Sequence, residues 1–473
     1  MFKVNGRNAL YLSLPIFQIK IAKKLIRYFV LRTKKQKLES RIFMILRQPM
    51  SGFFLPIQTK HVGFLFIALF FSMISSFAQP ATDPFLQKLL EKNPEWFDSI
   101  LKNPKNYGVQ ILYTKIDRNR KNEPKFTTYR YNVDRNAYFY PASTVKLPAV
   151  LLALEKLNQL KIPGVDKETP MITEAARPEQ TAALTDTTAE NGLPSVAHYA
   201  RKILLASDND AFNRLYEFIG QEDFNERLRA KGYQDVRMRH RLEQPMSVEN
   251  NRYTNPVRFE KDGKVLYQQP MAYAQKTYAP ENPIRQGKGY MKGNTLVEEP
   301  FDFTDKNFFG LENQHNMLRA IFFPETLEPS QRFDLLPDDY TFLYRYMSQL
   351  PMETSYPEHY SEDLHDSYVK FLMFGDSKKR MPRHIRMFNK VGDAYGYLLD
   401  NAYIVDFERG IEFFLTAVIY CNQNQIFNDD TYDYETVGFP FMAHLGKAVF
   451  EYEVSRKRRT RPDLSRFEVE YDK

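Results

Sequence analysis

The chain has 473 residues, of which 43% are hydrophobic and 26% are charged, so it has enough apolar surface for a sizeable core. This composition excludes a collagen-like chain, a wholly disordered chain and a polytopic membrane protein. The formal net charge of +8 arises at the start: residues 1–60 hold 13 Lys or Arg against one acid, whereas residues 79–473 hold 53 basic and 57 acidic residues. A nucleic-acid partner is therefore not expected.

The first 78 residues are expected to be an N-terminal extension and signal peptide. A basic region precedes the apolar run at residues 62–71, and small residues follow as far as Ala78. The run is short for a membrane span, which predicts export, to the periplasm, with cleavage after Ala78 and no stable span thereafter; an uncleaved anchor is the alternative. Because the basic region is long for a signal peptide, translation is expected to begin later, at Met44 or Met50.

The first half of the remaining chain predicts a hairpin followed by a block of helices. Alternating apolar residues after Asn106, a polar stretch and the segment KFTTYRYNV indicate a β-hairpin. Ser143 is expected to cap a helix that follows at once, and a second helix opens at Ser195. Ser-Asp-Asn-Asp at residues 207–210 predicts a turn and cap before a further helix, and another helical stretch stops at Gly232.

The second half is less regular and then returns to strands. Residues 255–335 are rich in Pro, Gly, Asn and aromatics and predict a surface insertion. The other expected elements are helices at 340–347 and 362–374, strands at 398–405 and 411–420 joined by the turn 406–410, a helix at 439–452 and a solvated tail from 455. This order predicts one catalytic domain at 79–473 of the α+β class: an antiparallel sheet made from both ends of the chain, flanked by helices, with a helical block inserted.

The single cysteine, Cys421, excludes an intrachain disulfide. It lies at the end of the apolar run that begins at Phe414, so we expect a buried core thiol and not a nucleophile.

Ser143-Thr144-Val145-Lys146 is the first candidate for chemistry. A serine at a helix start with a lysine three residues later places a hydroxyl and an amine on adjacent turns of one face, where the amine can take the hydroxyl proton. The spacing alone is weakly specific, because Ser99 and Lys102 share it without a capping context. A helix cap beside a surface lysine is the structural alternative.

Two further motifs follow in order. Ser207-Asp208-Asn209 by itself describes a turn and a helix cap. Lys390-Val391-Gly392 comes before an apolar strand and would place an ammonium beside an edge strand. Lys261-Asp262-Gly263 has the same pattern but lies in the polar insertion, so we discount it.

These three motifs together resemble the serine β-lactamases and penicillin-binding proteins, whose signature is Ser-x-x-Lys, Ser-Asp-Asn and Lys-Thr-Gly. The chain looks most like the class A β-lactamases over about residues 95–455, apart from the insertion. The resemblance implies a β-lactamase/transpeptidase-like fold, an α/β sandwich. It also implies Ser143 as the acylated nucleophile, Lys146 as its proton partner and Ser207 as a proton relay to the leaving nitrogen.

The resemblance implies substrate-binding roles as well. Asn209 would contact the substrate amide, Lys390 would attract the substrate carboxylate, and Gly392 would also bind the substrate. The backbone amides of Ser143 and Asp393 would form the oxyanion hole.

The sequence departs from the family pattern in three places. Glu243 lies 36 residues after Ser207, the family's spacing for the glutamate that activates the deacylating water, but it lacks the usual Glu-x-x-Leu-Asn context; a surface glutamate is the alternative, and Glu249 a weaker substitute. Val391 stands where the family has a hydroxyl residue, which predicts poor turnover of common penicillins. The interval from Glu243 to Lys390 is about twice what compact members need.

The leading interpretation is thus an exported serine hydrolase of the class A β-lactamase type, acting on β-lactams or peptidoglycan-derived substrates without a cofactor. No histidine spacing predicts a metal site, and no phosphate-binding loop is present. A D-alanyl peptidase or another amide or ester hydrolase is one alternative, and a weakly active cell-wall binding protein is another. The sequence does not determine the oligomeric state.

Overall fold

The computed structural model describes residues 82–356 and 364–472. The expected extension, the signal peptide and the cleavage point after Ala78 lie outside the described residues. Among the residues that the structure describes, no helix is long and apolar enough to cross a membrane.

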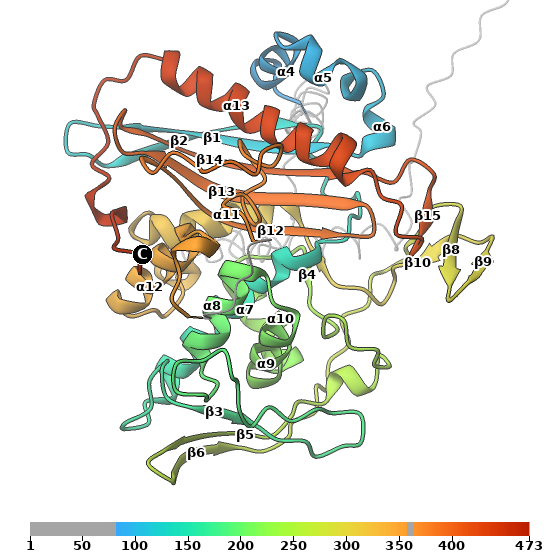
Figure 1. Cartoon of the computed structure of the whole chain (residues 1–473), viewed down its shortest axis with the longest axis vertical. Helices are drawn as coiled ribbons and strands as arrows, with labels where there is room; N and C mark the ends of the chain where they lie inside the picture. Colours follow the sequence, from blue (N-terminus) through green and yellow to red (C-terminus); the bar gives the residue numbers. More distant parts are fainter. Residues whose placement is uncertain (1–81, 357–363, 473) are drawn as a thin grey trace, which may run out of the picture. The chain divides into compact units, whose positions relative to one another are not determined.

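A five-stranded antiparallel sheet runs through the centre of the fold, with the strand order β12-β13-β14-β1-β2 (Figure 1). Its strands are β1 (Gln110–Arg118), β2 (Pro124–Tyr131), β12 (Ile385–Ala394), β13 (Tyr397–Asp406) and β14 (Ile411–Tyr420). Because β1 pairs with β14, the two ends of the chain meet in one sheet. The expected hairpin, the two expected C-terminal strands and the α+β fold class are confirmed.

The strands β13 and β14 lie inside the sheet, and both of their faces are covered. Every residue of β13 is buried, and in β14 only the last one is not. The strand β14 is mostly apolar, whereas β13 also buries Asp400, Asn401 and Asp406. The turn between them closes with a hydrogen bond from the Gly410 amide to the Asp406 carbonyl at 2.9 Å. Gly410 has a φ of 67°, a conformation that glycine adopts without steric cost.

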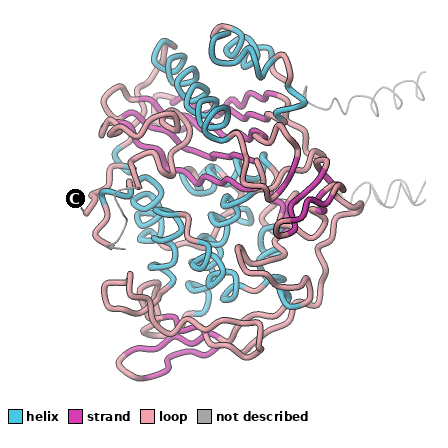
Figure 2. Tube along the Cα trace, turned by 45° about the vertical axis from the view of Figure 1, so that its right-hand side comes forward, coloured by secondary structure: helices cyan, strands magenta, loops and turns pink. Residues whose placement is uncertain are grey.

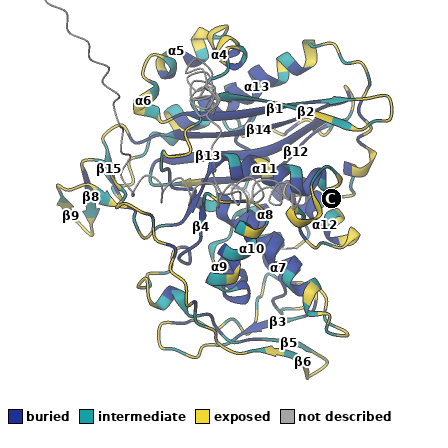
Figure 3. Cartoon of the chain, turned by 180° about the vertical axis from the view of Figure 1, so that it is seen from behind, coloured by how far each residue is buried: buried dark blue, intermediate teal, exposed yellow. Residues whose placement is uncertain are grey.

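Helices cover both faces of this sheet. Figure 1 places α13 with α4, α5 and α6 on one face and the helical block on the other, and Figure 3 shows the buried strands between the two layers. The first layer contains α4 (Pro84–Glu91), α5 (Pro94–Leu101), α6 (Pro104–Tyr107) and α13 (Phe439–Ser455). The helical block contains α7 (Lys146–Leu160), α8 (Val196–Ala206), α9 (Asn209–Ile219), α10 (Gln221–Ala230), α11 (Leu311–Phe322) and α12 (Pro337–Ser348). A separate hydrophobic core fills each side of the sheet.

Short strands form small sheets outside the central one, and Figure 2 shows some of them at the lower end and on the right of the view. They are β3 (Met171–Thr173) with β5 (Val257–Lys261) and β6 (Lys264–Gln269); β8 (Gly289–Lys292) with β9 (Thr295–Val297) and β15 (Ile426–Phe427); β7 (Arg285–Gln286) with β10 (Phe301–Asp302); and β4 (Val236–Arg237) with β11 (Phe308–Phe309).

The prediction of a surface insertion at 255–335 is wrong for its last part. Helix α11 packs on the sheet, and its residues Leu318, Ile321 and Phe322 are fully buried. The prediction of a helix at 362–374 is also wrong over the described residues 364–374, which form turns. Phe371 and Leu372 donate their amides to a buried carboxylate there, so side-chain bonding replaces the helical pattern.

The C-terminal tail is not a solvated end, which corrects a further prediction. Phe467 is fully buried and contacts Phe322 and Tyr403, and Leu464 is buried nearby. Two large apolar side chains therefore fix a segment whose other residues are mostly polar. Cys421 is buried, as predicted.

Candidate active site

Ser143 lies in a short 3₁₀ turn, η1 (Ala142–Val145), which leads directly into α7. The turn is fixed by Thr144, whose amide and hydroxyl both donate to the Pro141 carbonyl, at 3.1 and 2.6 Å. The expected cap is therefore wrong: α7 begins at Lys146, and no side chain caps it. The 3₁₀ turn leaves the Ser143 hydroxyl available for other partners.

Lys146 is fully buried and reaches both motif serines. Its Nζ lies 2.7 Å from Ser143 Oγ and 3.1 Å from Ser207 Oγ, and it also donates to the Ser207 carbonyl. Burial lowers the pKa of Lys146 to about 7, although the nearby carboxylates Asp208 and Asp393 oppose the shift. A lysine with such a pKa is partly neutral near pH 7 and can accept a proton from the hydroxyl beside it.

Ser207 lies between α8 and α9, and its side chain points toward Lys146 and Lys390. It ends α8 with a φ of 57°, in the left-handed region, and Asp208 then caps α9 by accepting the Ala211 amide at 2.7 Å. The predicted turn and cap are confirmed. Asn209 is the first residue of α9, next to this turn, and its contact with a substrate amide stays a prediction.

Lys390 approaches Ser207 from the sheet. It lies on β12, the edge strand, and its Nζ is 2.8 Å from Ser207 Oγ and 2.9 Å from the Val391 carbonyl. Burial, with the neighbouring Lys146 charge, lowers the pKa of Lys390. Ser143, Lys146, Ser207 and Lys390 thus form one hydrogen-bonded chain built from η1, α7, the α8–α9 turn and β12.

Gly392 brings the edge strand against the backbone of Ser143. A Cβ at this position would lie 2.8 Å from the Ser143 nitrogen and 3.0 Å from the Pro141 carbonyl oxygen, so only glycine permits this approach. Asp393 follows on the same strand, and its side chain is exposed. The predicted use of the Ser143 and Asp393 amides as an oxyanion hole stays a prediction.

Glu243 is exposed and lies in the left-handed region, with a φ of 52°. The neighbouring Leu242 is fastened to α9 by two hydrogen bonds with the Asn213 side chain, at 2.9 and 2.7 Å. The Glu243 charge acts on the active site. It opposes the burial that lowers the pKa of Lys146, and it adds to the burial that raises the pKa of Tyr140. Among the described residues, its carboxylate forms no hydrogen bond with Ser143 or Lys146.

A cavity of about 480 Å³ opens beside Ser207 along the edge strand. Its lining includes Ser207, Tyr368, Val391, Asp393 and Glu435. The sequence motifs point to the Asp393 amide alone, whereas the lining also contains the Asp393 carboxylate, Tyr368 and Glu435, which no motif indicates. The position of Asp393 directly after Lys390-Val391-Gly392 was the available signal.

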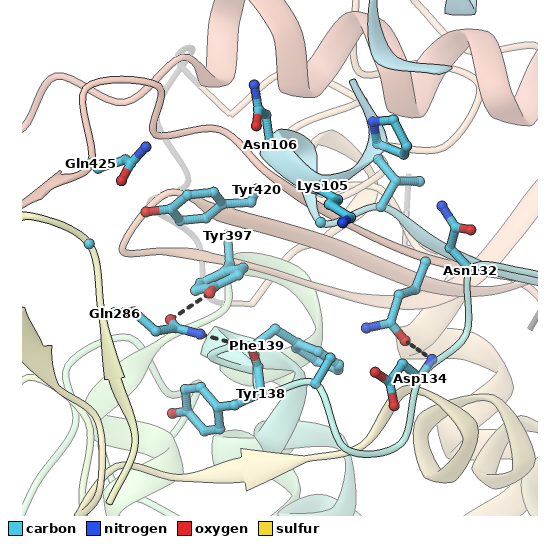
Figure 4. A pocket seen from close by; sticks show the side chains of 16 residues that line it. Lys105, Asn106, Asn132, Asp134, Tyr138, Phe139, Gln286, Tyr397, Tyr420 and Gln425 are labelled. Carbon is cyan, nitrogen blue, oxygen red and sulfur yellow. Dashed lines mark hydrogen bonds between the residues drawn. The ribbon is translucent and has the colours of Figure 1, made fainter. Parts of the chain in front are cut away.

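A second cavity, of about 690 Å³, lies elsewhere and is shown in Figure 4. Tyr397 donates to Gln286 at 2.6 Å there, and Gln286 donates to the Tyr138 carbonyl at 3.0 Å. None of the four hydrogen-bonded motif residues lines it, so it is distinct from the candidate active site.

The discounted motifs have ordinary structural roles. Lys102 pairs with Asp98 at 2.6 Å on exposed surface. Lys261 is the last residue of β5, and Asp262 and Gly263 form the turn that leads to β6. Within residues 82–356 and 364–472, no group of three or more His, Cys, Asp or Glu side chains is arranged to hold a metal ion.

Comparison with protein families gives one match: the model of the β-lactamase enzyme family matches residues 104–277. This segment contains the Ser143 and Ser207 motifs and Glu243. Over this segment the chain is similar to the β-lactamase enzyme family, and the match together with the motifs supports a hydrolase of the serine β-lactamase-like kind.

Solved structures of β-lactamases are also similar. Those from Sphaerobacter thermophilus, Burkholderia phymatum and Xanthomonas campestris pv. campestris share 13%, 13% and 14% identity, with TM-scores of 0.42, 0.43 and 0.41. The similarity covers 75%, 77% and 78% of this chain and 94%, 98% and 97% of theirs. A comparison with curated protein sequences gives no match.

Proposed function

We propose that this protein is an exported hydrolase of the class A β-lactamase type, which opens β-lactam amides through an acyl-enzyme on Ser143. The observation that carries the proposal is the contact between Lys146 Nζ and Ser143 Oγ at 2.7 Å, with the lysine buried and its pKa lowered to about 7. A buried amine in this state activates a neighbouring hydroxyl as a nucleophile.

In the proposed acylation, neutral Lys146 accepts the Ser143 hydroxyl proton while Oγ forms a bond to the carbonyl carbon. The negative charge on the carbonyl oxygen is stabilised by the amides of Ser143 and Asp393. As the tetrahedral intermediate collapses, the carbon–nitrogen bond breaks, and the proton reaches the leaving nitrogen through Ser207. The hydrogen bonds from Lys146 and Lys390 to Ser207 Oγ support this relay.

In the proposed deacylation, Glu243 removes a proton from water, whose oxygen attacks the ester carbonyl. The ester carbon–oxygen bond then breaks, and the proton passes from Glu243 through Lys146 to Ser143 Oγ, which regenerates the hydroxyl. The family spacing and the effect of its charge on Lys146 support this role. Its exposure and its left-handed backbone favour the alternative of slow deacylation, as in a penicillin-binding or D-alanyl peptidase-like enzyme.

The test is the intact mass of residues 79–473 after timed exposure to a penicillin and a cephalosporin. We expect a short-lived adduct with loss of the drug, which Ser143→Ala abolishes. Ser99→Ala is the matched control, because Ser99 has the same spacing to a lysine without the contact, and it should behave as the wild type. A long-lived adduct would indicate the penicillin-binding alternative. Neither an adduct nor hydrolysis would overturn the proposal.

A further inference from the structure

The cavity of Figure 4 lies at the ends of three neighbouring strands of the central sheet. Tyr397 begins β13, Tyr420 ends β14 and Gln110 begins β1, and all three residues line the cavity. Each of these strands pairs with a neighbour on both sides, so its backbone is not available to an extended peptide. The volume of about 690 Å³ is in the range of small-molecule sites.

The segment between Glu243 and Lys390 supplies one wall of this cavity. Gln286 accepts the Tyr397 hydroxyl at 2.6 Å and donates to the Tyr138 carbonyl at 3.0 Å. Gly287 has a φ of 75°, and a Cβ there would lie 2.6 Å from the Gln425 carbonyl oxygen. Only glycine permits this approach, so the wall is held firmly against the rest of the lining.

The lining has no net charge. The described lining contains two charged residues of opposite sign, Lys105 and Asp134, and both are exposed. Its other polar side chains are amides and tyrosine hydroxyls. Burial raises the pKa of Tyr420 to about 12 and raises the pKa of Tyr397 as well, so both hydroxyls stay protonated near pH 7. An anionic or cationic ligand would therefore gain little from this cavity.

Several polar groups of the lining have bonding capacity that the protein does not use. Gln110 is only 6% exposed; its Oε1 accepts the Asp134 amide at 3.0 Å, but its Nε2 donates to none of the described residues. The Tyr420 hydroxyl accepts from Asn422 at 3.1 Å and, among the described residues, donates to no acceptor. An apolar ligand would cover these donors without satisfying them, which is costly. The ligand must therefore carry oxygen acceptors.

Aromatic rings lie beside these donors. Figure 4 shows Tyr420, Tyr397 and Tyr138 in a row, with Asn132 and Asp134 on the opposite side of the view. The rings of Tyr397 and Tyr420 are 4.8 Å apart, and Tyr420 is partly exposed. A sugar ring combines an apolar C–H face, which packs on an aromatic ring, with hydroxyl groups that pair with amides.

We propose that this cavity binds an uncharged oligosaccharide, with Tyr420 as the ring on which a sugar packs and with Gln110 and Gln425 as partners of its hydroxyl groups. The inference is independent of the proposed function, because none of the hydrogen-bonded motif residues lines the cavity. It also gives the segment that carries Gln286 a role, which is to close one wall of the sugar site.

The experiment is calorimetric titration of the purified protein with three uncharged trisaccharides: chitotriose, cellotriose and maltotriose. We expect at least one to bind with a Kd of about 1 mM or below. The best ligand distinguishes a chain of acetylated amino sugars from a chain of glucose. Acetyl-trialanine amide, an uncharged peptide, should bind at least about tenfold more weakly, because it has no C–H ring face. Binding of none of the sugars would overturn the inference, and so would a peptide that binds as tightly.

Variants then locate the binding. Tyr420→Leu should weaken binding by about tenfold, and Gln425→Ala by about threefold to tenfold. Tyr368→Leu and Gln423→Ala are the matched controls: Tyr368 lines the cavity beside Ser207, Gln423 is exposed outside both linings, and neither change should alter binding. Unchanged affinity in Gln425→Ala, or in a folded Tyr420→Leu, would overturn the inference. Weaker binding in Tyr368→Leu would do so too, because it would place the sugar beside the nucleophile.

Two measurements keep the inference separate from the proposed hydrolysis. Gln425→Ala should open β-lactams at the wild-type rate, and Ser143→Ala should bind the sugar as the wild type does. Loss of sugar binding in Ser143→Ala would refute the inference. A protein that binds the sugar but does not react with any β-lactam would refute only the proposed function.

Discussion

Gly392 lies so close to Ser143 that an added Cβ would stand 2.8 Å from the Ser143 nitrogen. Contact at this distance cannot be relieved by moving a flexible side chain, because the clashing atoms belong to the backbone. The edge strand can therefore approach the turn of the nucleophile only because residue 392 has no side chain. The same approach positions the two backbone amides that are proposed for the oxyanion hole.

Gly392→Ala should displace the Ser143 amide and reduce the acylation rate by about a hundredfold to a thousandfold, the usual effect of losing one oxyanion donor. Single-turnover acylation by a β-lactam is the measurement. Gly310→Ala is the matched control: its Cβ would meet Asp235 Cβ at 3.0 Å, so it should reduce stability without a comparable loss of activity. Equal effects of the two variants on acylation would contradict the argument.

The acylation rate should depend on pH through Lys146. Because burial lowers its pKa to about 7, Lys146 is protonated below this pH and neutral above it, so the rate should rise through about pH 7 to a plateau. Lys146→Arg keeps a positive charge that does not titrate in this range, and it should lower the plateau by about a hundredfold to ten-thousandfold. The same rising profile in Lys146→Arg would show that another group accepts the proton.

Glu243→Gln separates the two halves of the reaction. If Glu243 activates the deacylating water, the variant should be acylated at the wild-type rate and should accumulate the acyl-enzyme, with turnover reduced about a hundredfold or more. Time-resolved intact mass measures both steps. Glu249→Gln is the control, since Glu249 is an exposed residue of the same loop that pairs with Arg252, and it should deacylate normally. A fast-deacylating Glu243→Gln would favour a water activated elsewhere.

The sequence predicted the site better than it predicted the surrounding fold. The motif serines and lysines could be found because their spacing is independent of tertiary packing, and the structure brings four of them together. Strand β12 was not recognised as a strand through Lys390, because its buried residues include Asn389 and Lys390. Because these residues are polar, the sequence does not show the alternating or apolar pattern of a strand. In the structure, Lys390 is hydrogen-bonded to Ser207 and to the Val391 carbonyl, and Asn389 is hydrogen-bonded to Lys370 and Asp400.

A similar cause explains why α11 was not predicted to be part of the core. Helix α11 buries polar residues among its apolar ones, including Gln314 and His315, and an apolar pattern does not predict the burial of these polar side chains. Their partners lie on distant strands: Asn401 donates to the Gln314 carbonyl, and His315 contacts Thr416. These pairings join residues that are far apart in the sequence, so a local sequence pattern does not predict them.

His315 should make folding stability fall at low pH. Its two ring nitrogens lie 2.6 Å from Thr114 Oγ1 and 2.8 Å from Thr416 Oγ1, and burial lowers its pKa to about 3. Between about pH 6.5, the ordinary pKa of histidine, and pH 3, the unfolded chain binds a proton that the folded chain does not, so stability decreases as the pH falls.

At pH 5 this difference should cost about 2 kcal/mol relative to pH 7. His315→Gln removes the titrating group, so its loss of stability between pH 7 and pH 5 should be smaller than that of the wild type by about this amount, whatever its stability at pH 7. Urea unfolding at the two pH values measures the change. An equal pH 5 loss in both proteins would mean that His315 binds its proton in the folded state as readily as in the unfolded chain.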